Sequence, residues 1–191
     1  MPGKMIIVSA PSGAGKTTIV KYITDNIPSL GFSVSATSRP PRKGETDGKD
    51  YYFLSASGFK DGIERGDFVE WEEVYHGHYY GTLKSEVERI WADGMNIIFD
   101  VDVKGGIALK RLYADKALSL FIMPPNIEEL EKRLRLRGKE SEEKIRMRVD
   151  KAAEEIGYAG RFDEIIINDD LATAQMKALE IIENFLNWNG Q

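Results

Sequence analysis

Cysteine is absent from the 191-residue chain, which excludes disulfides and cysteine-ligated zinc or iron–sulfur sites. Long hydrophobic runs are absent too. The apolar segment from Met5 to Val8 is far too short for the core of a signal peptide, and no later stretch approaches the length of a membrane span. We therefore expect a cytoplasmic protein without a membrane partner.

The chain also has fewer basic than acidic residues. The 26 lysines and arginines are outnumbered by 31 acidic residues, which gives a net charge of -5. Because nucleic acid favours basic surfaces, we expect no nucleic-acid partner, and any anion site must be local. Hydrophobic residues at 42% and charged residues at 30% are typical of a globular protein, and the length suits a single domain.

The apolar runs follow a pattern typical of α/β proteins. Four of them are bounded by turn residues and followed by segments with helical periodicity. Strands that are apolar throughout and alternate with helices indicate a parallel sheet covered on both faces. These runs extend from Met5 to Val8, Asn96 to Val101, Ala117 to Met123 and Ile165 to Ile167.

Two segments depart from this pattern. The stretch from about Ser33 to Thr82 has alternating, aromatic-rich segments and a predicted tight turn at His76-Gly77-His78, which indicates a small, mostly antiparallel insertion. The stretch from Glu131 to Asp150 is dense in arginine and lysine. In it, Gly138 is predicted to end one helix and Ser141 to start the next.

The most specific local signal is a glycine-rich loop between a predicted strand and a helix that starts near Lys16. Its backbone N–H groups, the helix N-terminus and the lysine together fit a di- or triphosphate. A glycine-rich turn without a ligand is the alternative, and Ala10 stands where the usual motif begins with glycine. The residues predicted to bind ATP here are Ala10, Pro11, Ser12, Gly13, Ala14, Gly15, Lys16, Thr17 and Thr18.

A second signal is the apolar strand Asn96 to Asp100, which ends in a carboxylate. In a parallel sheet Asp100 would emerge beside the glycine-rich loop, where it could hold Mg²⁺ or its waters. The hydroxyl of Thr17 stands where the loop motif places a Mg²⁺ ligand. We therefore predict Mg²⁺ as cofactor, with Thr17 and Asp100 as its protein ligands. The alternative for Asp100 is a turn-forming residue at a strand end.

Two arginines flank two prolines in the sequence Arg39-Pro40-Pro41-Arg42. Each proline favours an extended backbone at and before its own position, so the two guanidinium groups are held on a stiff segment that suits a phosphate. The alternative is a solvated basic loop.

The chain resembles the guanylate kinases, which are P-loop nucleoside monophosphate kinases. The resemblance covers nearly the whole chain, and its specificity lies in the order and spacing of the motifs. They are the glycine-rich loop, Ser35 with Arg39-Pro40-Pro41-Arg42, Gly48-Lys49-Asp50-Tyr51, Glu70, Tyr79-Tyr80-Gly81-Thr82, Asp100-Val101-Asp102, Arg137-Gly138 and Asn168-Asp169-Asp170-Leu171.

The resemblance implies an α/β P-loop kinase core, in which a parallel five-stranded sheet is flanked by helices, with a nucleoside-monophosphate-binding insertion and a helical lid. On this basis we divide the single domain into a core of residues 1–32, 83–132 and 151–191, an insertion of 33–82 and a lid of 133–150. Both monomers and oligomers occur in the family, so the oligomeric state stays open.

The implied reaction is direct phosphoryl transfer from ATP to GMP, and with it dGMP, without a phosphoenzyme. The resemblance implies phosphate contacts for the lid arginines, structural roles for Arg135 and Arg146, and an adenine-pocket role for Asn168. Solvated charged helices, and an N-cap near Asn168, are the alternatives. Residues implied for GMP are Ser35, Arg39, Arg42, Tyr51, Glu70, Tyr80, Thr82, Asp102 and Arg148; those added for ATP are Arg133, Arg137 and Asn168; those implied for catalysis are Lys16, Arg39, Arg137 and Arg148.

A carboxylate in the binding site can distinguish guanine from adenine by hydrogen bonding. Guanine presents donors at N1 and the 2-amino group, which a carboxylate such as Glu70 can accept, whereas adenine presents an acceptor at N1. The rival functions are a kinase for another base and a non-catalytic interaction module. Glu70 and Asp102 argue against the first, and Lys16 argues against the second. The segment between Trp71 and Gly77 is one residue longer than the family pattern, and His76 and His78 are expected to be surface residues.

Overall fold

The computed structural model describes residues 3–137 and 141–188. Its main sheet is parallel and five-stranded, in the order β2-β7-β1-β8-β9. This confirms the predicted α/β core, and the four apolar runs form four of its strands. The strands are β1 (Met5–Ser9), β2 (Leu30–Ser33), β7 (Asn96–Asp100), β8 (Ala117–Met123) and β9 (Glu164–Ile167).

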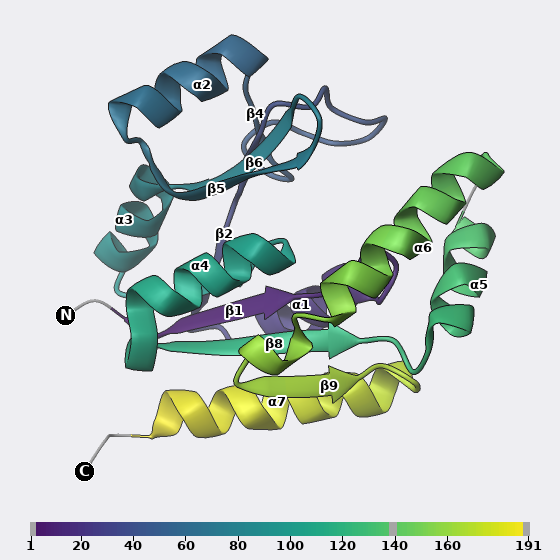
Figure 1. Ribbon diagram of the computed structural model, residues 1–191. Coiled ribbons are helices and arrows are strands. Elements are labelled where there is room, and N and C mark those ends of the chain that lie inside the picture. The colour runs from purple at the N-terminus through teal and green to yellow at the C-terminus, as the bar shows by residue number, and fades with distance from the viewer. Residues whose placement is uncertain (1–2, 138–140, 189–191) are drawn as a thin grey trace.

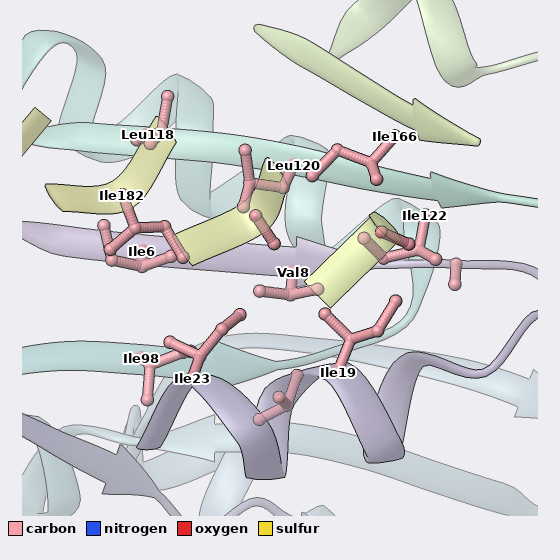
Figure 2. Close-up of a cluster of buried hydrophobic side chains, with 14 of the residues drawn as sticks. Ile6, Val8, Ile19, Ile23, Ile98, Leu118, Leu120, Ile122, Ile166 and Ile182 are labelled. Atoms are coloured by element: carbon pink, nitrogen blue, oxygen red, sulfur yellow. The ribbon is translucent and has the colours of Figure 1, made fainter. Parts of the chain in front are cut away.

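Helices cover both faces of this sheet, which explains why its central strands are apolar throughout. In β1, Ile6 and Val8 pack toward α1 and α7, as Figure 2 shows, while Met5 and Ile7 pack on the other face with residues of α3 and α4. The helices of the core are α1 (Lys16–Asn26), α3 (Lys84–Ala92), α4 (Val103–Tyr113) and α7 (Leu171–Asn187); the 3₁₀ turns are η1 (Ala114–Lys116) and η2 (Ala159–Arg161).

The insertion is a separate four-stranded sheet of order β4-β3-β6-β5. Its β5–β6 hairpin is antiparallel and turns at Gly77 (φ 76°), as predicted, whereas β3 and β4 pair in parallel. A helix, α2, packs on it through Phe59, which is fully buried and stacks on Phe68 at 4.3 Å between ring centroids. The bounds are β3 (Ala36–Thr37), β4 (Tyr52–Phe53), α2 (Ala56–Arg65), β5 (Phe68–Tyr75) and β6 (His78–Leu83).

The basic segment forms two helices, α5 (Ile127–Arg137) and α6 (Glu142–Ile156). Ser141 starts α6 as predicted, because its side chain accepts a hydrogen bond from the Lys144 amide. Gly138 lies outside the described residues. Figure 1 shows this pair beyond the carboxyl ends of the strands, with the insertion above the sheet. Among the described residues, no helix is long and apolar enough to cross a membrane.

Candidate active site

A cleft of about 1060 Å³ opens at the carboxyl ends of the parallel strands, where ligand sites of such sheets form. Four parts of the chain line it: the loop from Ala10 to Gly15, here called the phosphate loop, together with the start of α1; residues 100–102 at the end of β7; one face of the insertion; and one face of α6. The predicted residues that line it are Ala10, Pro11, Ser12, Gly13, Gly15, Lys16, Thr17, Ser35, Arg39, Arg42, Tyr51, Glu70, Tyr80, Asp100, Asp102 and Arg148.

The phosphate loop has the backbone that its sequence predicts. Gly13 and Gly15 adopt φ of 96° and 95°, a left-handed conformation that favours glycine, and α1 begins at Lys16 immediately afterwards. Its N-terminal amides have no side-chain cap and remain suited to an anion. Ala10 does not have a positive φ, so this backbone does not require the glycine of the usual motif. Ala14 and Thr18 do not line the cleft.

Lys16 joins the phosphate loop to the end of β7. Its ammonium lies 2.5 Å from Oδ1 of Asp100 and donates to the Val101 carbonyl at 2.7 Å. Because β1 and β7 are parallel neighbours, with Val8 opposite Asp100, the lysine and the carboxylate reach the same edge of the sheet. The lysine is thereby positioned beside the loop and within the cleft, together with the exposed Thr17.

Asn168 lies behind the phosphate loop rather than in the cleft wall. It is buried, and its side chain donates to the Ala14 carbonyl at 2.7 Å. Its own carbonyl accepts from Arg133 at 2.9 Å, and Arg133 also pairs with Glu129. The two residues therefore tie α5 and the end of β9 to the loop. The alternative of a nearby N-cap also holds, because Asp170 accepts from the Thr173 amide at the start of α7.

The acidic wall of the cleft centres on Glu70, which is only 9% exposed. Thr82, opposite it on β6, is fully buried and donates to Glu70 Oε1 at 2.7 Å. Burial raises the pKa of Glu70 to about 7; the Thr82 hydrogen bond opposes this shift, and the nearby Asp102 adds to it. Asp102 also caps α4, accepting from the Gly105 amide at 2.9 Å.

Arg39 forms the basic part of the insertion's wall. Its guanidinium makes a bidentate salt bridge with Glu45, in which the two terminal nitrogens lie 2.6 and 2.7 Å from the carboxylate oxygens, and it lies over the Tyr51 ring. The hydrogen bond from Arg39 holds the pKa of Glu45 down at about 2. Burial raises the pKa of Tyr51 to about 12. The Arg39 Nε is buried and has no hydrogen-bond partner among the described residues.

The guanylate kinase family model matches residues 2–185 of the chain. The chain belongs to the guanylate kinase family. It is 54% identical to a guanylate kinase of Porphyromonas gingivalis, covering 96% of this chain and 98% of that one. It is 50% identical to a guanylate kinase of Bacteroides thetaiotaomicron, covering 98% and 92%.

A solved guanylate kinase structure agrees with this family assignment. A guanylate kinase from Anaplasma phagocytophilum, 28% identical, superposes with a TM-score of 0.80 and covers 98% of this chain and 88% of that one. A shikimate kinase from Bacteroides thetaiotaomicron, only 14% identical, reaches a TM-score of 0.51 over 94% and 98% of the chains and shares the fold alone.

Sequence reasoning identified only part of the α6 wall of this cleft. The four-residue spacing of Lys144 and Arg148 places both on one helical face, and the structure adds Met147, Lys151 and Glu155 to that face. Their spacing of three and four residues is a helical stripe, a signal that could have found them. Arg137 ends α5, but its side chain lies outside the described part of the structure.

The two histidines of the hairpin differ in their surroundings. His76 is fully exposed, as expected. Both histidines line the cleft, but His78 is half-buried and its Nδ1 is buried, so the expectation of a surface residue was wrong for His78. It alternates with Tyr80 along β6, so both residues lie on the same face of the strand.

Proposed function

We propose that the chain transfers the terminal phosphoryl group of ATP to GMP in this cleft, without a covalent enzyme intermediate. The observation that carries the proposal is the meeting of two features in one cleft: a phosphate loop with Lys16 at one side, and the buried carboxylate of Glu70 at the other. The first suits a triphosphate, and the second suits the donor edge of guanine.

The acceptor nucleotide is placed by its base and its phosphate. Glu70 accepts from guanine N1–H and the 2-amino group, with Thr82 holding the carboxylate in place; Asp102 accepts from the 2-amino group and Ser35 donates to O6. Adenine would set its N1 acceptor against the Glu70 oxygen, and such a mismatch can cost roughly 10⁴-fold in specificity. Arg39, Arg42, Tyr51 and Tyr80 hold the phosphate; dGMP offers the same base and phosphate.

The donor nucleotide is placed by the phosphate loop. Its backbone amides and Lys16 bind the phosphates, and Lys16 exchanges its contacts with Asp100 and Val101 for phosphate oxygens. Positive charge from Lys16 and Arg148 offsets the charge on the phosphoryl group as it moves, while in-line placement of the two nucleotides does the remaining work. Asn168 and Arg133 act on ATP by fixing the loop and α5, and Arg137 is assigned to ATP by the family pattern.

The residues present fit a Mg²⁺ ion that arrives with ATP. Such an ion keeps several waters and takes only one or two protein oxygens, which the Thr17 hydroxyl and the Asp100 carboxylate can supply from the same cleft. When bound, Mg²⁺ neutralises phosphate charge. We retain the assignment of residues 33–82 to the GMP-binding insertion and 133–150 to the lid; α6 runs unbroken from that range into the core.

The proposal is tested by ADP production from ATP and Mg²⁺ with GMP, AMP, CMP or UMP as acceptor. We expect rapid turnover with GMP and a Glu70→Gln variant that loses most of its activity toward GMP. Turnover with another base would contradict the base assignment. A folded protein with no GMP-dependent turnover would contradict the kinase function and favour an interaction module.

A further inference from the structure

Helix α6 joins the parts of the cleft that bind the two nucleotides. Arg148, Lys151 and Glu155 follow one another at intervals of three and four residues, so they lie on one face of the helix, and all three line the cleft. The other face of α6 is turned toward α5, where Arg146 lies with Glu131 and other charged side chains. Only Arg148 of the cleft-facing stripe has a role in the proposed reaction.

The strand opposite this stripe carries an irregularity. The pairing of β5 with β6 shifts between Glu73 and Tyr75, because Glu73 lies opposite Tyr79 and Tyr75 lies opposite His78. Val74 is therefore the extra residue of a β-bulge. Bulges bend a strand and redirect its side chains, and this one lies where the strand reaches α6. Val74 and Tyr75 both line the cleft.

Lys151 clasps this bulge. Its ammonium donates to the Val74 carbonyl at 3.0 Å and lies 4.2 Å from the centre of the Tyr75 ring. Glu155, one turn further along α6, lies 3.8 Å from the same ammonium. A carbonyl, an aromatic face and a carboxylate thus share one half-buried cation, and the first two belong to the insertion while the third belongs to α6.

Charged residues from both sides of the cleft act on Tyr75 and Glu155. Burial raises the pKa of Tyr75; the charges of Arg148 and Arg42 oppose that rise, and Glu155 and Tyr80 add to it. Burial also raises the pKa of Glu155, and Lys151, Lys16 and the Ser12 backbone N–H oppose that rise. Tyr75 and Glu155 line the same cleft as Lys16 beside the phosphate loop and as Arg42 and Arg148, which are assigned to GMP.

We propose that Lys151 is a positioning residue for phosphoryl transfer: by clasping the β5 bulge it sets the separation between α6 and the insertion. Arg148 lies one turn before Lys151, so the clasp holds that arginine in the cleft that Arg42 and Tyr80 also line. It makes closure over one nucleotide favour closure over the other. The role rests on the proposed function, because it needs two nucleotides in the cleft.

The test uses the whole chain with Lys151→Met, which keeps the apolar stem and removes the ammonium. GMP affinity is measured by calorimetry with and without a non-hydrolysable ATP analogue and Mg²⁺. We expect the analogue to tighten GMP binding by at least about fivefold in the unaltered chain. In the variant each nucleotide alone binds as before, the mutual tightening disappears, and kcat falls about tenfold, as small misplacements of reacting groups produce. Lys151→Arg restores most of both.

Arg146→Met is the matched control, since it removes a cation from the other face of the same helix and should change neither quantity. Tyr75→Leu provides a second route if Lys151→Met does not fold, and it should also abolish the mutual tightening; where both fold, the double variant should be no worse than either single one. Three results would overturn the positioning role alone. They are additive effects of the two substitutions in the double variant, a Lys151→Met variant that keeps both the mutual tightening and its kcat, and an unaltered chain in which the ATP analogue does not tighten GMP binding. Absence of GMP-dependent turnover in the unaltered chain would overturn the proposed function with it.

Discussion

The proposed contact between Glu70 and guanine predicts that GMP binding depends on pH. Burial places the pKa of its carboxyl at about 7. Guanine offers only donors to this carboxylate, so GMP binds the ionised form and its affinity falls as Glu70 becomes protonated. At pH 6 about one-tenth of the carboxyl groups are ionised and at pH 8 about nine-tenths, so GMP affinity should rise about tenfold over this range.

The assay is the dissociation constant of GMP measured by calorimetry from pH 6 to pH 8. The Glu70→Gln variant is the matched control, because it cannot titrate at this position and keeps only the change due to the GMP phosphate, whose second pKa is about 6. The difference between the two profiles isolates Glu70. Parallel profiles, or an affinity that rises toward pH 6, would refute the reasoning.

The same shift has a defined effect on stability. The folded chain holds the Glu70 proton up to about pH 7, whereas the unfolded chain releases it near the ordinary value of 4.5. The folded state therefore binds more protons between these values, and the contribution of Glu70 to the free energy of unfolding falls as pH rises through that window. Glu70→Gln should remove this fall, which urea denaturation at pH 5 and pH 8 can measure.

Three further predictions concern other parts of the chain. Lys16→Met should lower GMP-dependent ADP production by about 10²-fold or more while the protein stays folded; a loss under about threefold in a coupled assay would contradict its role. Gly15→Ala would set a Cβ 2.4 Å from the Asn168 side chain at φ 95°, and it should lower the free energy of unfolding by at least about 2 kcal/mol in urea denaturation. Gly94→Ala is the control, because φ there is 72° and nothing lies within 4 Å, and it should cost about 1 kcal/mol. Equal costs would contradict the contact with Asn168. Lys4 donates to the carbonyls of Phe185, Leu186 and Trp188 at the end of α7, so Lys4→Met should cost about 1–2 kcal/mol, and an unchanged unfolding midpoint would contradict this.

Local signals predicted much of the fold. The apolar runs in β1, β7 and β8 are largely buried because helices cover both faces of the sheet there, whereas Ile165 and Ile167 of the edge strand β9 are exposed. Ser141 caps α6 as its residue type predicts. The strand β2 was not recognised from its own residues, since Gly31 interrupts its pattern. That glycine is needed because a Cβ there would lie 2.4 Å from the Ile90 side chain, a contact that local sequence does not reveal.

The helix of the insertion escaped prediction for a related reason. Gly58 and Gly62 weaken the helical pattern of α2, although Ser55 caps its start and Gly66 ends it with φ of 72°, which are signals that could have found it. Gly62 lies where a Cβ would come within 2.9 Å of the Phe68 ring. Packing against β5 therefore determines the residue, at the expense of helix propensity.

The cleft was predictable where motifs are continuous and not where partners are distant in sequence. The phosphate loop is one unbroken segment, so its residues could be named directly. Asn168 bonds to Ala14 across 154 positions, and Lys151 bonds to Val74 across 77. Such contacts depend on how β9 and α6 are placed in the fold, and the identity of an asparagine or a lysine does not indicate which distant residue it will contact.

Direct transfer is the central claim, and the fate of labelled phosphate tests it most directly. The chain is incubated with Mg²⁺ and ATP labelled in the terminal phosphate, once without GMP and once with it, then denatured without acid, and the products are separated. The account predicts label in the terminal phosphate of GDP and none on the protein. Label retained on the denatured protein, or released as inorganic phosphate in place of GDP, would contradict it.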